Sequence, residues 1–428
     1  MNLSQEEIMS GSLPRAAAGA GDAPSPGGVG TRDQVLPAGR IEPAWLSGGE
    51  GIPTGEEARR LWLECLKLDP WGGLELHPGW ALDPRARAGG APIISARWNV
   101  EHGEAASLGS LAVLRPRAVR MRPIPGLTWK VVLRGLRLEG GRVLGDNGPV
   151  PLAAFIGDVT RLLAAGDADC LLIEDLERGS PLWDALDEAG RGRDLAFFPY
   201  TPQPRWWIDF PEVPGDYWKK FSSKTRNTLR RRLKKIGASI TRYAEESEVP
   251  TLLEKAHHVS KRTWQNRRLG LRIKDSPEER AFYAFAASCG ALRSYILERE
   301  GRPCAFLMGI QWKGRFKLQE IGYDEADAKY APGTVLLFQV LEDIIAHETP
   351  RSVDFGPGDY DYKQLFGDRH TYSGRVLLVR RSWRPMVVAR LDQFRGRAHQ
   401  GLRDYLRNIG VFNRLKKIYH KMPRLVKS

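Results

Sequence analysis

One order of predicted elements occurs twice along the 428-residue chain, and this repetition constrains the fold more than any other feature. Each copy has a helix, β-rich segments, a Gly/Pro-containing loop, an apolar helix and a final strand. The first copy has a helix opening at Thr54, β-rich segments at 92–98, 107–119 and 129–138, a helix at 152–165 and a strand at 170–173. The second has a helix at 250–267, strands at 293–299, 305–312 and 316–323, a helix at 335–346 and a strand at 352–355. We therefore predict an α/β protein with a mixed sheet, built from two copies of one unit.

Local composition adds two segments to these units. Residues 1–40 are rich in Gly, Ala, Ser and Pro, which predicts a disordered leader. We expect the first unit over 41–200, the second over 201–384 and a basic helical tail over 385–428. Apolar residues recur at helical spacing from Leu402 to Tyr419 of the tail, with Arg and Lys between them. This pattern indicates an amphipathic helix or helix pair that either docks on the fold or lies on an anionic membrane surface.

Overall composition excludes several classes of protein. Hydrophobic residues make up 42% of the chain and charged residues 27%, which is typical of globular proteins. No window approaches the ~18 apolar residues of a membrane span, and the first residues lack the apolar core of a secretory signal. The four cysteines and eight histidines are scattered, without the spacing of metal ligands. We expect a cytoplasmic protein with no metal, held at most peripherally on a membrane.

The net charge of +14 is concentrated in two basic segments. Residues 219–235 contain nine Lys/Arg and no acid, and residues 380–428 contain fourteen Lys/Arg against Asp392 and Asp404. In a predicted helix at 217–236, apolar residues at 3–4 spacing leave the cations on the other face. This face is either simply solvated or contacts an anionic partner. The polar face lacks the aromatic residues of a base-stacking surface, which disfavours nucleic acid.

The segment Tyr330-Ala331-Pro332-Gly333-Thr334 lies between a predicted strand and an apolar helix. A helix N-terminus offers unpaired N–H groups and a partial positive charge, which suit a phosphate. Gly333 lets the backbone approach such a ligand, and Thr334 either caps the helix or contacts the phosphate. Pro and Gly are also frequent at ordinary helix starts, so such a segment taken alone is more often structural than functional.

Three segments together resemble one protein family. They are FSSKTRNTLRRRLKKI at 221–236, the G-Y-D…Y-A-P-G-T segment at 322–334 and DFGPGDYDYKQLFG at 354–367. They are similar to the GNAT-like N-acyltransferases that include CelD-type cellulose-biosynthesis proteins, relatives of the FemAB double-GNAT transferases. The resemblance is best over 205–380 and weak over 45–195, where it implies a degenerate first GNAT unit. The usual GNAT loop reads Gln/Arg-x-x-Gly-x-Gly/Ala, and here only Gly333 clearly matches it.

The resemblance implies transfer of an acyl group, acetyl or longer, from acyl-CoA to a primary amine of a small molecule, peptide or sugar. The residues expected to bind the CoA are Gly322, Tyr323, Tyr330, Pro332, Gly333 and Thr334. The backbone N–H of Gly322 would polarise the thioester carbonyl. The general base would be Asp354 or Glu320, and we prefer Asp354 because it follows the buried helix where the sheet would open.

A further run, Gly-Asp-Tyr-Asp-Tyr-Lys at 358–363, adds Asp359, Tyr362 and Lys363 to the expected catalytic residues. A phenol can protonate a leaving thiolate, and a lysine can neutralise a carbonyl oxygen, a phosphate or an acidic group. Alternatively, Asp354 caps the loop and Tyr362 packs against Phe366. No Cys or Ser occupies a nucleophile setting, which favours direct attack by the amine over an acyl-enzyme.

Two rival functions stand beside this prediction. The first is a FemAB-like transferase that uses aminoacyl-tRNA, bound by the 219–235 segment. The second is a GNAT scaffold without catalysis that acts in polysaccharide biosynthesis. For an acyltransferase, the anionic partner of residues 219–235 would be the CoA phosphates or an acidic acyl-carrier protein.

Overall fold

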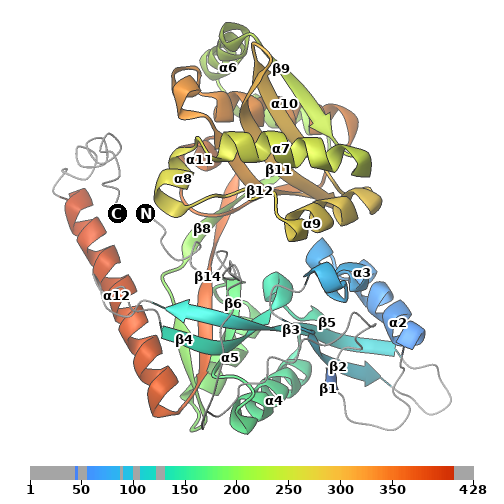
Figure 1. Cartoon of the computed structure of the whole chain (residues 1–428), viewed down its shortest axis with the longest axis vertical. Coiled ribbons are helices and arrows are strands. Elements are labelled where there is room, and N and C mark those ends of the chain that lie inside the picture. The colour runs from blue at the N-terminus through green and yellow to red at the C-terminus, as the bar shows by residue number, and fades with distance from the viewer. Residues whose placement is uncertain (1–43, 47–54, 87–89, 100–106, 122–130, 409–428) are drawn as a thin grey trace, which may run out of the picture.

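A computed structural model describes residues 44–46, 55–86, 90–99, 107–121 and 131–408 of the chain. The predicted leader at 1–40 lies outside these residues, as do the side chains at 402–408 and everything from 409 onward. The described strands form one 14-stranded sheet that runs β1-β2-β3-β4-β6-β14-β8-β13-β12-β11-β10-β9, with β5 beside β3 and β7 beside β14. This order is nearly symmetric about the β14–β8 pair, as expected for two copies of one unit (Figure 1).

The first unit extends from β1 to β7. Its elements are β1 (Ala44–Leu46), α2 (Gly55–Leu68), η1 (Leu74–Leu76), α3 (Pro78–Ala81), η2 (Pro84–Ala86), β2 (Ile93–Asn99), β3 (Ser107–Met121), β4 (Val131–Leu138), η3 (Glu139–Gly141), β5 (Leu144–Gly145), α4 (Pro149–Ala165), β6 (Cys170–Glu177), α5 (Pro181–Arg191) and β7 (Leu195–Pro199), where η marks a 3-10 helix. The parallel strands β4 and β6 are joined through α4.

The second unit begins with β8 and is followed by a long helix. Its elements are β8 (Gln203–Asp209), η4 (Pro214–Lys220), α6 (Ser223–Ile236), β9 (Ala238–Tyr243), η5 (Glu246–Glu248), α7 (Val249–Ser260), α8 (Trp264–Leu269), α9 (Pro277–Ser288), β10 (Ser294–Arg299), β11 (Arg302–Trp312), β12 (Arg315–Tyr323), η6 (Glu325–Tyr330), α10 (Pro332–His347), β13 (Ser352–Pro357), α11 (Asp361–Phe366) and β14 (Arg369–Arg380), and then α12 (Trp383–Asn408). The parallel strands β12 and β13 are joined through α10, as β4 and β6 are through α4.

The two units exchange strands at the centre of the sheet. β14, from the end of the second unit, pairs with β6 and β7 of the first unit and also with β8. β8, which directly follows the first unit, pairs with β13 of the second. The predicted boundary at residue 200 falls between β7 and β8, but the sheet continues across it. The two units therefore share one backbone hydrogen-bond network.

Two helices predicted as continuous are interrupted by capping residues. The helix predicted at 217–236 consists of η4 and α6, because the Ser222 hydroxyl accepts a hydrogen bond from the Thr225 N–H and starts a new helix. The helix predicted at 250–267 ends at Ser260, and Thr263 caps α8 in the same way. The hydroxyl residues Ser222 and Thr263, which interrupt the apolar spacing, mark these helix breaks in the sequence.

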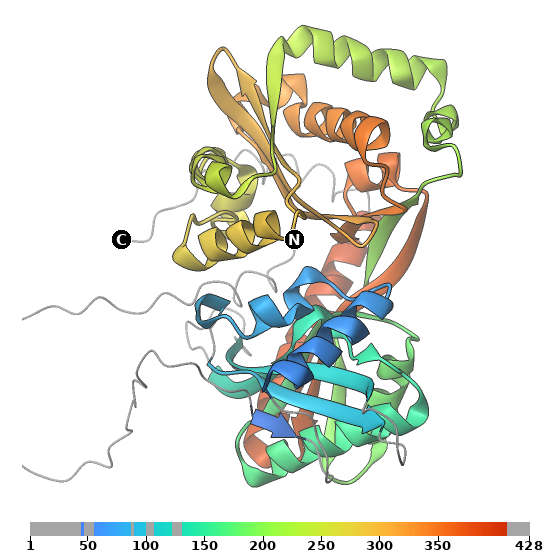
Figure 2. The same ribbon diagram turned by 90° about the vertical axis from the view of Figure 1, so that its right-hand side faces the viewer.

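Helices cover both faces of the sheet in the second unit. α6 and α10 pack on one face around Leu229, Phe316 and Leu336, and Figure 2 shows α6 lying over α10 at the end farthest from the first unit. α7 and α9 pack on the opposite face around Phe306 and Met308. Eight of the sixteen residues of α10 are buried and all eight are apolar, which confirms the buried helix predicted at 335–346.

The first unit also contacts the second through the β11–β12 hairpin. Lys313 donates to the carbonyls of Leu66 and Asp69, and Arg315 donates to that of Pro70 over 2.9 Å. Lys317 pairs with Glu75 at 3.3 Å. These contacts hold the loop after α2 against the strand that carries Glu320.

Candidate active site

The parallel strands β12 and β13 separate soon after they begin. Their paired residues are Arg315↔Ser352, Phe316↔Val353 and Lys317↔Asp354, and the pairing ends there. Beyond this point β12 has a bulge: Leu318 lies opposite Gly309 and Glu320 opposite Met308, so Gln319 is the extra residue. A bulge re-aims the side chains that follow it. Glu320 consequently shares a face with Met308 and the α7–α9 layer, at the point where the two strands diverge.

Asp354 is fully buried and both of its carboxylate oxygens are occupied. Arg205 of β8 donates its Nε to Oδ1 over 3.0 Å and a terminal nitrogen to Oδ2, and the Gly356 N–H donates to Oδ1 over 2.8 Å. Burial raises the pKa of this carboxyl, but the Arg205 guanidinium, together with Lys317 and the Gly356 N–H, holds the pKa below its ordinary value. A carboxylate with no free oxygen and a lowered pKa is poorly placed to accept a proton. The geometry favours a structural role for Asp354.

Glu320 is bound through one oxygen only. Arg272 donates both its Nε and a terminal nitrogen to Oε2, over 2.9 and 2.7 Å. No described donor bonds to Oε1, and the side chain is 18% exposed. Arg272 thus fixes the orientation of the carboxylate and leaves its second oxygen available. Of the two predicted carboxylates, Glu320 alone keeps an oxygen to which no described donor bonds.

The Tyr362 ring of α11 packs edge-on against Phe355, with centroids 6.3 Å apart. The charge of Glu320 acts on both Tyr362 and Lys363, and that of Asp354 acts on Lys363. Burial raises the pKa of Tyr362 well above its ordinary value, and the charge of Glu320 adds to the effect, so the phenol stays protonated. Burial lowers the pKa of Lys363 to about 8, against the attraction of Asp354 and Glu320. The Lys363 Nζ donates to the carbonyls of Gly356 and Pro357, over 2.9 and 2.6 Å, and so holds the turn between β13 and α11.

Asp359 lies apart from these groups. It is exposed and accepts a hydrogen bond from the Gln364 side chain at the start of α11. The structure therefore brings together Glu320, Asp354, Tyr362 and Lys363, whereas Asp359 lies on the surface.

The six residues predicted to bind CoA lie at the end of β12 and the start of α10. Ala331 has a left-handed backbone (φ 52°), and no side chain caps the N-terminus of α10. A Cβ at Gly333 would lie 3.2 Å from the Tyr323 ring, which therefore flanks this N-terminus. The Arg299 guanidinium lies 4.6 Å from the Tyr330 ring centroid, and the Lys329 Nζ lies 5.0 Å from the same centroid. Pro332 and Thr334 belong to the first turn, whose N–H groups are open to an anion.

Gly322 serves close packing. A Cβ at this position would lie 2.6 Å from the Phe306 ring and 3.1 Å from Thr263. Only glycine fits between the strand and the α7–α8 layer without movement of Phe306. The predicted contact between its N–H and a thioester carbonyl stays a prediction.

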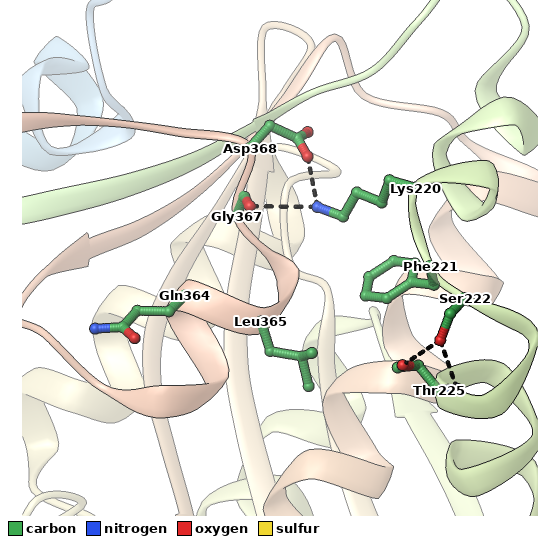
Figure 3. A pocket seen from close by; sticks show the side chains of 8 residues that line it. All are labelled: Lys220, Phe221, Ser222, Thr225, Gln364, Leu365, Gly367 and Asp368. Carbon is green, nitrogen blue, oxygen red and sulfur yellow. Dashed lines mark hydrogen bonds and ion pairs between the residues drawn. The ribbon is translucent and has the colours of Figure 1, made fainter.

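A shallow cavity of about 500 Å³ lies on the outer side of α11, between it and the start of α6 (Figure 3). Its lining includes Lys220, Phe221, Gln364 and Asp368. The Lys220 Nζ donates to the Phe366 carbonyl over 2.6 Å and pairs with Asp368, so its charge is already neutralised. None of the predicted catalytic residues lines this cavity. It is separate from the site at β12 and β13.

Three residues of the cluster escaped the sequence analysis. Arg205 lies in a strand next to two tryptophans. A single cation there suggests an ion pair, but the sequence does not identify the carboxylate that pairs with it. Arg272 follows α8 in a loop without a recognisable motif. Glu75, from the first unit, is paired with Lys317. Burial raises its pKa, but Lys317, a backbone hydrogen bond and Arg315 together lower it below its ordinary value.

Residues 223–364 match the family model described as an acetyltransferase (GNAT) domain. FemX is similar in structure, with a TM-score of 0.52 at 12% identity, over 74% of this chain and 95% of FemX. The C-terminal domain of a putative lysylphosphatidylglycerol synthetase from Agrobacterium fabrum gives a TM-score of 0.46 at 13% identity, over 78% and 95%. A tandem GNAT protein from the clavulanic acid biosynthesis pathway gives 0.43 at 12%, over 77% and 96%. No curated protein sequence matches the chain.

The likeness to FemX shows the fold. The chain has a mixed α/β fold with one large mixed sheet, which confirms the predicted fold class, and residues 223–364 within it are similar to GNAT acetyltransferase domains. The finer resemblance to CelD-type proteins stays a prediction. Within the described residues, no group of side chains has the composition of a metal site, and no helix is long and apolar enough to cross a membrane.

Proposed function

We propose that this protein transfers an acyl group from acyl-CoA to a primary amine where β12 and β13 separate. The observation that carries the proposal is that no described donor bonds to Oε1 of Glu320, whose charge helps to raise the pKa of the Tyr362 phenol. An amine attacking a thioester must lose a proton, and the departing sulfur must gain one. The site offers one group suited to each transfer.

The donor would be held at the start of α10. The N–H groups of Gly333 and Thr334 are available to the pyrophosphate, and Gly333 carries no side chain to obstruct it. Lys329 adds positive charge beside Tyr330, whereas Arg299 is paired with Asp327 and Glu300. α6 contacts η6, so its basic last turn, with Lys234 and Lys235, lies near the same loop. Acyl-CoA supplies the activated thioester carbonyl.

In the proposed reaction Glu320 Oε1 accepts a proton from the amine, directly or through a water molecule. The new N–C bond forms as the C–S bond breaks, and the Tyr362 hydroxyl gives its proton to the sulfur. Proton return from Glu320 to Tyr362 through solvent restores both groups, so the transfer balances. Arg272 keeps Glu320 oriented, and the Arg205–Asp354 pair with Lys363 fixes β13 and α11 around them.

The test is release of free CoA from acetyl-CoA and from longer acyl-CoAs in the presence of a panel of primary amines. We expect turnover with at least one amine, and its loss in Glu320→Gln and Tyr362→Phe. Asp359→Asn, a surface carboxylate of the same segment, is the matched control and should retain full activity. Absence of CoA binding together with absence of turnover would overturn the proposal, whereas CoA binding without turnover on any amine would favour a scaffold.

A second candidate, an aminoacyl-tRNA-dependent transferase, rests on α6. The outward residues of this helix include Arg230, Arg231, Arg232, Lys234 and Lys235, and α6 contains no acid. Nucleic-acid affinity falls steeply with salt, because each phosphate contact releases counterions. Tight, strongly salt-dependent binding of tRNA without binding of CoA would favour this candidate.

A further inference from the structure

Helix α12 uses one face to dock on the first unit. Val388 and Ala389 are buried against β7 and β14. Asp392 on the same face accepts hydrogen bonds from the Tyr200 hydroxyl over 2.6 Å and from Arg395 over 2.9 Å. The Gln393 amide donates to the Pro199 carbonyl over 2.8 Å. This face is fully engaged, and Figure 1 shows the helix running along one side of the molecule.

The opposite face carries a stripe of exposed apolar side chains. Trp383 is 80% exposed, Val387 49%, Leu391 39% and Phe394 71%. At 100° per residue these four positions fall within an arc of about 80°, so they form one continuous line along the helix. Isolated exposed apolar residues are ordinary, but an aligned set with two aromatic members indicates a contact surface.

Arginines flank this apolar stripe on both sides. Arg384 follows it on one side of the helix wheel, next to Arg395, which pairs with Asp392, and Arg390 and Arg397 follow it on the other. Asp392 is the sole acid among residues 383–401, and it is buried on the docked face. The outward face is therefore apolar in the centre, cationic at both edges and free of acids over this stretch.

We propose that the outward face of α12 lies on the surface of an anionic lipid bilayer. Trp, Phe and Leu would enter the boundary between headgroups and acyl chains, while the long arginine side chains extend to the lipid phosphates. Anionic headgroups attract each basic residue held near the surface. This inference is independent of the proposed acyl transfer, because no residue of the stripe belongs to the site at β12 and β13.

The charge of this face favours a bilayer over a second copy of the chain and over the chain's own segment at 409–428. A second copy docked through the same face would bring two sets of arginines together without an acid to neutralise them. The remaining segment at 409–428 contains six Lys/Arg and no acid, so α12 would repel it as well. The same segment strengthens attraction to an anionic surface, since it continues directly from the helix.

The test measures co-sedimentation of the full chain with vesicles of phosphatidylcholine alone and of phosphatidylcholine mixed with phosphatidylglycerol. We expect binding to the mixed vesicles that weakens with salt, and at least tenfold weaker binding to phosphatidylcholine. Trp383→Ser/Phe394→Ser should weaken binding to mixed vesicles at least tenfold, and Arg390→Gln/Arg397→Gln should reduce the preference for anionic lipid. These side chains are exposed, so thermal unfolding should be unchanged.

Two matched variants control for general effects. Leu68→Ser/Val150→Ser removes apolar side chains that are 84% and 80% exposed elsewhere, and Arg231→Gln/Arg232→Gln removes two exposed arginines of α6. Both should bind vesicles as the wild type does. Equal losses in stripe and control variants would overturn the proposal, as would full binding by Trp383→Ser/Phe394→Ser. A wild-type dimer that this variant dissociates would assign the face to a second copy instead.

Discussion

Arg205 and Asp354 form a bidentate ion pair at the centre of the shared sheet, although 149 residues separate them in the chain. Arg205 belongs to β8, and Asp354 belongs to β13, which lies beside it. The Arg205 guanidinium also lies 3.9 Å from Asp175 of β6, in the first unit. One side chain thus connects carboxylates from both units beside the candidate active site.

Removing one partner of this pair should destabilise the fold. Asp354→Asn keeps the shape of the side chain but leaves the Arg205 charge without its main partner in the interior, which costs about 3–5 kcal/mol. Urea unfolding measures this loss. Arg205→Met/Asp354→Asn should be less destabilised than the sum of the single variants, because the second change removes the unpaired charge. A folded, stable Asp354→Asn with a large loss of kcat would instead assign Asp354 as the base.

Glu320→Gln should lower kcat by about 10²–10⁴, with little change in the KM for acyl-CoA, because the change removes a proton acceptor and keeps the hydrogen bonds from Arg272. Steady-state kinetics with separate variation of donor and amine measures both constants. The unfolding midpoint should stay near that of the wild type. Unchanged kcat in a folded Glu320→Gln would remove Glu320 from the proposed chemistry.

Lys363 should make stability depend on pH in the alkaline range. Its folded-state pKa is about 8, below the ordinary value of 10.5, so the unfolded chain binds more protons between these values. Its contribution to the free energy of unfolding therefore rises with pH, by up to about 1.4 kcal/mol per unit, from pH 8 to about pH 10.5. The free energy of unfolding of the wild type, minus that of Lys363→Met, should therefore rise over this range. A difference that is constant with pH would contradict the lowered pKa.

Neutralising part of α6 should weaken use of the donor without abolishing it. Arg230→Gln/Arg231→Gln/Lys234→Gln should raise the KM for acyl-CoA several-fold and flatten its dependence on salt, since each exposed contact contributes about 0.2–1 kcal/mol. Arg390→Gln/Arg397→Gln on α12 is the control and should leave this KM unchanged. An equal effect of both variants would indicate a response to net charge alone.

Much of the second unit could be predicted from local signals. The strands predicted at 293–299, 305–312, 316–323 and 352–355 agree with β10 to β13 to within about three residues. The pairing of strands that are distant in the sequence could not be predicted from local signals. The insertion of β14 between β6 and β8 depends on pairing of distant strands, and the bulge at Gln319 depends on the neighbouring strand.

Which of the two carboxylates is the better candidate for the general base also depends on contacts between residues that are distant in the sequence. Asp354 and Glu320 occupy similar positions in the sequence pattern. They differ in their arginine partners, because Arg205 occupies both oxygens of Asp354, whereas Arg272 occupies one oxygen of Glu320. The sequence pattern contains no trace of either pairing.

The central claim is that the second unit binds acyl-CoA at the start of α10, and calorimetric titration with CoA tests it most directly. Gly333→Asp places a carboxylate where the pyrophosphate would lie, and the backbone tolerates it because only the Tyr323 ring must adjust. Gly148→Asp at the start of α4 is the matched change in the first unit, where an aspartate suits the N-cap position once the Asp146 carboxylate, 3.1 Å from the new Cβ, moves aside. We predict that wild type and Gly148→Asp bind CoA with equal affinity, while folded Gly333→Asp does not. Unchanged CoA affinity in Gly333→Asp would contradict the account.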